Sequence, residues 1–186
     1  MNIVLVGKTG SGKTEIARLL TEYFRYEKIK TCTTRKRRDG ESAEAYTFLT
    51  DEEFDCADMV LKTAYCGNRY GTLKGSLNNC DNTVLIVDPS GLRELKKVEG
   101  FSFVSFFISC GTFRRYERCL NRGDQEEVVL RRIMKEAYIF DSLKTDFVIN
   151  NEDDIWSSVT KILDCVKDVV GCSHQDCTKS ESFRQV

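Results

Sequence analysis

A complete phosphate-binding loop near the N-terminus constrains the fold more than any other stretch of the sequence. The pattern G-x-x-x-x-G-K-[ST] is formed by Gly7, Lys8, Thr9, Gly10, Ser11, Gly12, Lys13 and Thr14. An apolar run at 3–6 precedes it, and residues 15–24 continue with the apolar period of a helix. A strand, this loop and a helix in that order predict a cradle for the phosphates of a nucleoside triphosphate.

Each residue type in the loop has a chemical reason to be there. Glycines let backbone N–H groups turn toward a polyphosphate, and Lys13 can reach its outer phosphates. The hydroxyl of Thr14 can bind Mg²⁺. We therefore expect residues 7–14 to bind the triphosphate and Thr14 to bind the metal, the alternative being an ordinary glycine-rich turn.

Length and charge exclude several other classes of protein. The 186 residues fit one domain, and 28 basic against 29 acidic residues leave a net charge of -1. Such a chain has no overall field to attract nucleic acid or an acidic membrane. No run reaches the ~18 apolar residues of a membrane span, and no leader precedes the first strand, so we expect a cytoplasmic protein.

Strands alternate with helices along most of the chain. Apolar strands are predicted at 3–6, 83–88, 101–109 and 147–149, and helices after Pro89, over 112–143 with a break near Gly123, and over 155–170. This order predicts an α/β three-layer core with a central parallel sheet over 1–30 and 82–170. Residues 31–81 lack long helices and predict a small β-rich lobe, while 171–186 predict a flexible tail.

Local signals give the lobe and the chain end more detail. The first helix is expected to end near Glu27, with short strands at 29–31 and 59–65. A capping box at Thr50 predicts a helix through Cys56, and 68–72 predicts a tight turn into a short helix at 74–79. Two interpretations stay open in the tail, where Cys172, His174 and Cys177 fit either a metal site or an unstructured end.

A basic run in the β-rich lobe is the candidate acceptor site. Residues 31–41 place Arg35, Lys36, Arg37 and Arg38 in succession between hydroxyl side chains. Arginine grips a phosphate dianion through two parallel hydrogen bonds, so the run could hold a second, smaller phosphate. A solvated basic loop is the alternative.

Six short motifs make the chain resemble the guanylate kinases, a family of P-loop nucleoside monophosphate kinases, through about residue 170. They are Thr31–Glu41 (S-x-T-T-R-x-x-R-x-G-E), Tyr46-Thr47-Phe48 (Y-x-F), Gly67–Thr72 (G-N-x-Y-G-[ST]), Asp88–Gly91 (D-x-x-G), the lid run 118–132 and Phe147–Asn151 (V-I-x-N). Their order and spacing match the family, although Tyr46 lies one residue closer than usual to the G-E pair.

The resemblance implies ATP-dependent phosphorylation of a nucleoside monophosphate, GMP or dGMP first, with Mg²⁺ as the cofactor of ATP. It places the monophosphate on Arg35, Arg38, Tyr46 and Tyr70, and the guanine on Thr31, Thr72 and Asp88. It assigns the transferring group to Lys13, Arg35 and the lid arginines Arg118, Arg122 and Arg132, and the adenine region to Asn151. Simpler roles stay open: Asp88 as a helix cap, Asn151 as a cap before Ile155, and the lid as a salt-bridged surface helix.

Two departures from the family pattern affect the base-binding site, at Leu61, and the surroundings of Mg²⁺, at Ile86. Leu61 stands where the family has an acid that reads guanine, and Ile86 replaces the first acid of its D-x-D element. An altered or broad base preference is therefore an alternative, because an apolar wall discriminates less than a hydrogen-bonding acid. A non-catalytic phosphopeptide-binding module and a sugar-phosphate kinase also stay open as functions, and the sequence does not indicate an oligomeric state.

Overall fold

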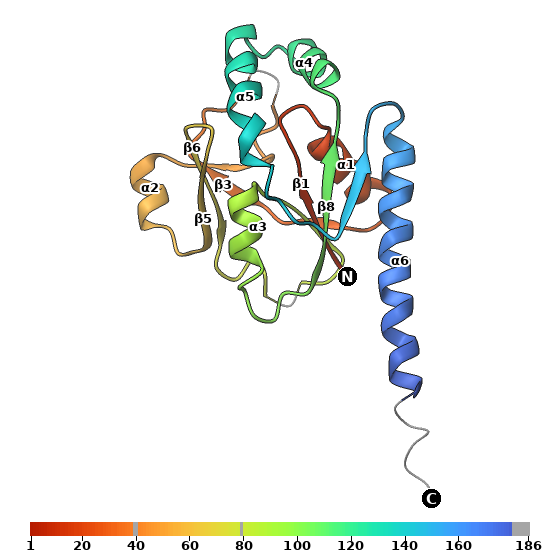
Figure 1. Ribbon diagram of the computed structural model, residues 1–186. Helices are drawn as coiled ribbons and strands as arrows, with labels where there is room; N and C mark the ends of the chain where they lie inside the picture. Colours follow the sequence, from red (N-terminus) through yellow and green to blue (C-terminus); the bar gives the residue numbers. More distant parts are fainter. Residues whose placement is uncertain (39–40, 79, 180–186) are drawn as a thin grey trace, which may run out of the picture.

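The computed structural model describes residues 1–38, 41–78 and 80–179, with the backbone alone for 172–179. A five-stranded parallel sheet forms the core (Figure 1). Its strands are β2 (Glu27–Lys28), β7 (Thr83–Ile86), β1 (Asn2–Val6), β8 (Phe103–Ser109) and β9 (Phe147–Asn150), in that spatial order. All neighbouring pairs are parallel, and the apolar runs of β1 and β8 suit strands covered on both faces.

Helices cover both faces of this sheet and give the expected three layers. On one face, α1 (Lys13–Tyr23) and α6 (Ile155–Lys179) pack through Ile16, Leu20 and Val159 against Leu5. On the other face, α3 (Pro89–Leu95) packs through its leucines onto Val4 and Val6. The predicted fold class is confirmed.

A four-stranded sheet forms a separate lobe, the acceptor lobe, over the region where the sequence predicted one. Its strands lie in the order β4 (Thr47–Phe48), β3 (Thr31–Thr33), β6 (Asn68–Leu73) and β5 (Met59–Tyr65), with α2 (Asp51–Cys56) beside them (Figure 1). Thr50 caps α2 in the predicted capping box with Glu53. Beyond the core sheet lie α4 (Thr112–Asn121) and α5 (Glu126–Ile139), which contain the predicted lid run 118–132 and which we call the lid region; the helices break at Gly123 as predicted.

The structure corrects the expected turn and helix after Gly67. Residues 68–72 belong to strand β6, and turns occupy 74–78, while residue 79 lies outside the described residues. The reason is a tight hairpin: Cys66 and Gly67 both have positive φ, at 50° and 80°, so Tyr65 pairs with Asn68 across a two-residue turn.

Several element boundaries also differ from the prediction, among them the end at 143 expected for the second lid helix, which stops at Ile139. Helix α1 ends at Tyr23, and the strand expected at 29–31 is replaced by β2 in the core sheet and β3 in the acceptor lobe. Helix α6 continues through the start of the predicted tail to Lys179. The side chains of Cys172, His174 and Cys177, and residues 180–186, lie outside the described residues, so the choice between a metal site and an unstructured end is not tested for these side chains.

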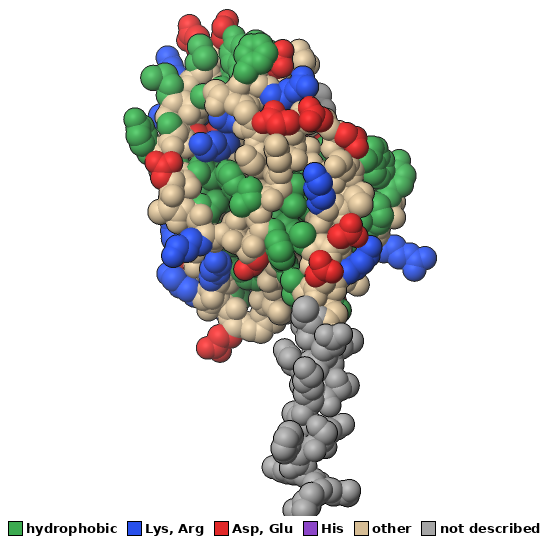
Figure 2. Space-filling view, turned by 45° about the vertical axis from the view of Figure 1, so that its right-hand side comes forward, with side chains coloured by type: hydrophobic (Ala, Val, Ile, Leu, Met, Phe, Trp, Pro, Cys, Tyr) green, Lys and Arg blue, Asp and Glu red, His purple; other side chains and the backbone are tan. Residues whose placement is uncertain are grey.

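Charges of both signs are scattered over the face shown in Figure 2, which suits a net charge of -1. Hydrophobic side chains lie among them, and at the lid end Phe113, Met134 and Tyr138 are exposed. Within the described part of the chain, no helix is long and apolar enough to cross a bilayer.

Candidate active site

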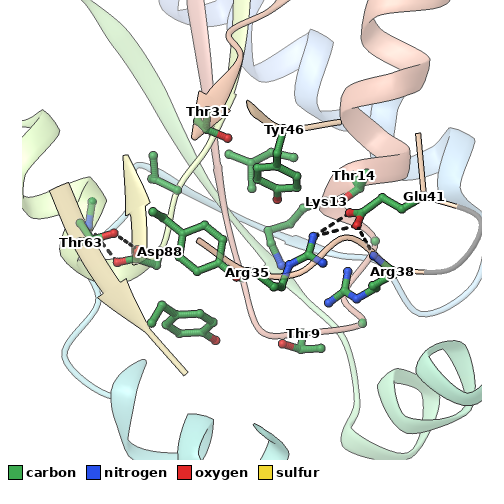
Figure 3. Close-up of a pocket in the computed structure, with 18 of the residues that line it drawn as sticks. Thr9, Lys13, Thr14, Thr31, Arg35, Arg38, Glu41, Tyr46, Thr63 and Asp88 are labelled. Carbon is green, nitrogen blue, oxygen red and sulfur yellow. Dashed lines mark hydrogen bonds and ion pairs between the residues drawn. The ribbon is translucent and has the colours of Figure 1, made fainter. Parts of the chain in front are cut away.

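A single cleft of about 700 Å³ lies between the phosphate loop and the acceptor lobe. The loop follows β1 and Asp88 follows β7, so both lie beyond the carboxyl edge of the parallel sheet, where ligands bind in open α/β folds. The acceptor lobe supplies the opposite wall from β3, β5 and β6. Figure 3 shows Lys13 and Thr14 in the same cleft as Arg35, Arg38 and Asp88.

The phosphate loop has the backbone shape that its glycines predict. Gly10 and Gly12 have φ values of 79° and 95°, which glycine adopts without strain. The Lys13 ammonium donates to the carbonyl of Lys8 at 2.9 Å and to the hydroxyl of Ser11 at 3.3 Å. Burial, followed by the nearby guanidinium groups of Arg122 and Arg115, lowers the pKa of Lys13 to about 8, against an opposing effect of Glu136.

Asn151 supports this loop from the last core strand. Its side-chain amide donates to the carbonyl of Ser11 at 2.8 Å, and its own oxygen accepts from the Ser158 hydroxyl at 3.0 Å. It is 1% exposed and packs against Gly12 rather than lining the cleft. The cap role for Asn151 is wrong, because Asp154 accepts the first N–H groups of α6; the expected place near adenine stays a prediction.

The basic run of the acceptor lobe divides into inward and outward side chains. Arg35 is buried and donates to Glu41 at 2.7 and 3.0 Å, with its guanidinium 5.4 Å from the centre of the Tyr46 ring. Arg38 also lines the cleft, whereas Lys36 and Arg37 are exposed. Tyr70 completes this group, 6.3 Å from Tyr46 between ring centres. We call Arg35, Arg38, Glu41, Tyr46 and Tyr70 the arginine end of the cleft.

Three arginines of the acceptor lobe and the lid meet on one carboxylate. Asp124, whose side chain is 7% exposed, lies 2.5 Å from Arg122, 3.4 Å from Arg38 and 3.8 Å from Arg132. Burial opposes the charge of Asp124, but these three cations outweigh it and lower its pKa. The alternative interpretation of the lid as a salt-bridged helix is thus partly confirmed. The acid at the centre of these ion pairs, Asp124, was not indicated by any sequence motif.

Arg118 is held at the edge of the phosphate loop. Its guanidinium donates to the carbonyls of Asn151 and Glu152 at 3.0 and 3.2 Å, and it lines the cleft. Arg118 and Arg122 both line the cleft, so two of the three predicted lid arginines reach it from α4 and its C-terminus. Arg132, on α5, joins them only through Asp124.

The other end of the cleft is poor in acids. Thr31, Leu61, Thr63, Thr72, Ile86 and Asp88 line it, and we call these six residues the Asp88 end. Asp88 caps α3 by accepting from the N–H groups of Ser90 and Gly91, and its second oxygen accepts from the Thr63 hydroxyl (Figure 3). The cap role of Asp88 is confirmed, and its carboxylate still lines the cleft.

The residues present fit a magnesium ion carried by nucleotide phosphates. Thr14 is exposed and lines the cleft next to Lys13. In loops of this pattern the Ser or Thr hydroxyl binds Mg²⁺, which takes further ligands from phosphates and water, so Thr14 is the residue that would hold the ion. Among the side chains that the structure describes, no group of three or more His, Cys, Asp or Glu residues could hold a metal alone.

Sequence reasoning missed several residues that shape this site. Thr63 and Tyr65 line the cleft from β5, and Asp124, Arg115 and Glu136 organise the lid. One signal was available for Glu136: it lies seven positions after the buried Val129 and so on the inner side of α5. An acid at such a position requires a partner.

A complete triphosphate-loop motif and a cluster of arginines and tyrosines that line the same cleft fit a P-loop phosphotransferase. A family model described as guanylate kinase matches residues 1–169. Guanylate kinase from Nitratidesulfovibrio vulgaris is 31% identical over 167 residues, which cover 81% of this chain and 79% of the relative. Guanylate kinase from Lactobacillus johnsonii is 26% identical over 185 residues, covering 92% and 88%. The chain belongs to the guanylate kinase family.

Solved structures agree at the level of the fold. A crystal structure of guanylate kinase from Anaplasma phagocytophilum superposes with a TM-score of 0.64 and 23% identity, covering 89% of this chain and 84% of that one. Shikimate kinase from Acinetobacter baumannii gives a TM-score of 0.55 and 16% identity over 90% and 93%. The core is thus shared among P-loop kinases that differ in their acceptor.

Proposed function

We propose that the chain transfers the terminal phosphoryl group of ATP to GMP or dGMP, giving the nucleoside diphosphate and ADP. The observation that carries this proposal is that the loop 7–14 and the arginine end, each suited to hold a phosphate, line one cleft. The curated relatives that match most of the chain are guanylate kinases, which supports guanine as the base. A phosphopeptide module has no need of an intact triphosphate loop and is not favoured.

The chemistry asks little of the protein beyond position and charge. The attacking group is an anionic phosphate oxygen of the acceptor, so no general base is required. Arg35 and Arg38 with the hydroxyls of Tyr46 and Tyr70 hold that phosphate, while Lys13 holds the outer phosphates of ATP. Magnesium bound at Thr14 with the ATP phosphates supplies further neutralising charge.

The lid arginines complete this arrangement. Arg118, Arg122 and Arg132 carry the positive charge that a transferring phosphoryl group needs, and Asp124 keeps two of them together with Arg38. The break at Gly123, where φ is 88°, gives the lid a place to bend. At the other end, Thr31, Thr72 and Asp88 provide the polar groups for the base.

A panel of acceptors tests the proposal. Purified protein is mixed with ATP, Mg²⁺ and each common ribo- or deoxyribonucleoside monophosphate, and ADP release is followed. We expect GMP and dGMP to give the fastest release. Background release with every acceptor would refute kinase activity, and a faster reaction with another base would refute the assignment of guanine.

A further inference from the structure

A buried ion pair at the base of the lid is not part of the phosphate contacts described so far. Glu136 on α5 is 0% exposed and Arg115 on α4 is 3% exposed, and the Arg115 guanidinium donates to Glu136 Oε2 at 2.9 Å. A buried pair of this kind is weak evidence for stability, because desolvation offsets the attraction between the charges. The remaining contacts of Glu136 therefore indicate what it does.

The pair grips one residue of the phosphate loop. The backbone N–H of Thr9 donates to Glu136 Oε1 at 2.8 Å, and Arg115 donates to the carbonyl of Thr9 at 3.2 Å. The next residue, Gly10, is seated directly on α4, since a Cβ there would lie 2.5 Å from the Arg115 carbonyl oxygen. The loop and the first lid helix are thus in backbone contact, and the backbone N–H and carbonyl of Thr9 are both hydrogen-bonded to the Arg115–Glu136 pair.

Tyr65 brings the acceptor lobe to the same carboxylate. Its hydroxyl, at the end of β5, donates to Glu136 Oε1 at 2.5 Å, and Tyr65 itself lines the cleft. Burial first, and then the charge of Glu136, raises the pKa of Tyr65, so the phenol keeps its proton and remains a donor. One carboxylate therefore joins the loop, the lid and the acceptor lobe.

We propose that Glu136 is a positioning residue for phosphoryl transfer, which fixes the Thr9 peptide of the phosphate loop to the base of the lid. Arg118 belongs to α4 and Arg132 to α5, so the same contact sets where these arginines stand relative to the triphosphate. Transfer rates depend strongly on such placement, and a shift of about 1 Å can cost roughly 100-fold. The expected change in kcat rests on the proposed function, whereas the expected change in ADP affinity does not.

The variant Glu136→Gln tests this role, because the amide keeps the size of the side chain but removes its charge and places a donor against donors. We expect weaker ADP binding by calorimetry, a higher KM for ATP and a kcat lowered by about 100-fold, with the KM for GMP changed much less. The matched control is Glu94→Gln, on the surface of α3. A folded Glu136→Gln protein with unchanged ADP affinity and kcat, or with only a lower melting temperature, overturns the proposal.

Tyr65→Phe keeps the proposal testable if Glu136→Gln does not fold, since it removes one donor and leaves the Arg115–Glu136 pair intact. We expect Tyr65→Phe to weaken ADP binding less than Glu136→Gln does. The effect is informative because Tyr65 belongs to the acceptor lobe and reaches the phosphate loop through Glu136. Tyr138→Phe, at a side chain 83% exposed, is the control. Unchanged ADP affinity in Tyr65→Phe overturns the proposal. The two proposals can fail separately. If the wild type does not phosphorylate GMP but Tyr65→Phe still binds ADP more weakly, the proposed function is refuted and the positioning role is supported.

Discussion

The phosphate loop and the Asp88 end of the same cleft are built in different ways. We infer that the loop binds phosphates through backbone N–H groups and Lys13, and Asn151, Arg115 and Glu136 hold it from other elements. At the Asp88 end, by contrast, side chains line the cleft. Leu61 there packs in the hydrophobic core, and Asp88 caps helix α3. The phosphate loop is therefore shaped by contacts from several elements, whereas Leu61 and Asp88 each serve the fold and the cleft together.

Lys13→Met is expected to have the largest effect, because it removes the only lysine of the G-K-T element. Loss of a preorganised group that stabilises developing charge typically costs about 100- to 1,000-fold in kcat. Kinetics with saturating GMP measure the loss, and Lys97→Met, at an exposed side chain in the turn after α3, serves as the surface control. A Lys13→Met enzyme with near-normal kcat would show that the loop does not act as proposed.

Arg35→Lys probes the arginine end. A lysine cannot make the two-pronged contact of a guanidinium, and it leaves Glu41 less well paired. We expect kcat/KM for GMP to fall by an amount that corresponds to a loss of about 1.5–3 kcal/mol of transition-state stabilisation, the range for hydrogen bonds to charged groups. ADP affinity should stay close to that of the wild type. Equal losses in ADP affinity and GMP turnover would mean that the two phosphate sites are not separate.

Leu61→Glu sharpens the contrast directly, since it returns an acid to the Asp88 end. We expect the ratio of kcat/KM for GMP to that for AMP to rise by about 1–3 kcal/mol in transition-state free energy, the cost of leaving a buried hydrogen-bonding group unpaired against the wrong base. Leu61→Gln, which is similar in size but uncharged, is the control. An unchanged ratio would place the base away from residue 61.

The smallest expected effect is a pH dependence of nucleotide binding. The pKa of Lys13 is lowered to about 8, mainly by burial, and bound phosphates favour its charged form. Affinity for ADP without divalent cation should therefore be fully present below pH 8 and weaken as the pH rises, by about tenfold per unit at most. Lys13→Met should flatten this profile between pH 7 and 9. A wild-type profile that is flat in the same range would contradict the shift.

Local patterns predicted much of the fold. The bounds of β5 at Met59–Tyr65, the Thr50 capping box and the cap at Asp88 follow from short stretches of sequence whose signals are self-contained. The β5–β6 hairpin was missed because its turn relies on a positive φ at Cys66, a conformation that cysteine seldom adopts. Helix α6 passes Gly171 because one glycine in a long helix costs only about 1 kcal/mol.

The site was predictable where a motif carries it and unpredictable where packing does. Arg35, Arg38, Tyr46 and Tyr70 were named from sequence and line one cleft. Glu136 and Arg115 were not, because their contact depends on how α4 and α5 pack, and neither lies in a motif. Asp124 was overlooked for the same reason, since its three arginine partners come from the lobe and both sides of the lid break.

The contacts of the phosphate loop have a consequence for the order in which the protein is made. Ser11 is held by a residue 140 positions later and Thr9 by one 127 positions later. A growing chain therefore carries the complete nucleotide motif long before it contains the side chains that fix its shape. Because a ligand stabilises the state that binds it, ATP will favour the nearly finished molecule over its early fragments. The nucleotide motif thus leaves the ribosome well before the residues that complete it.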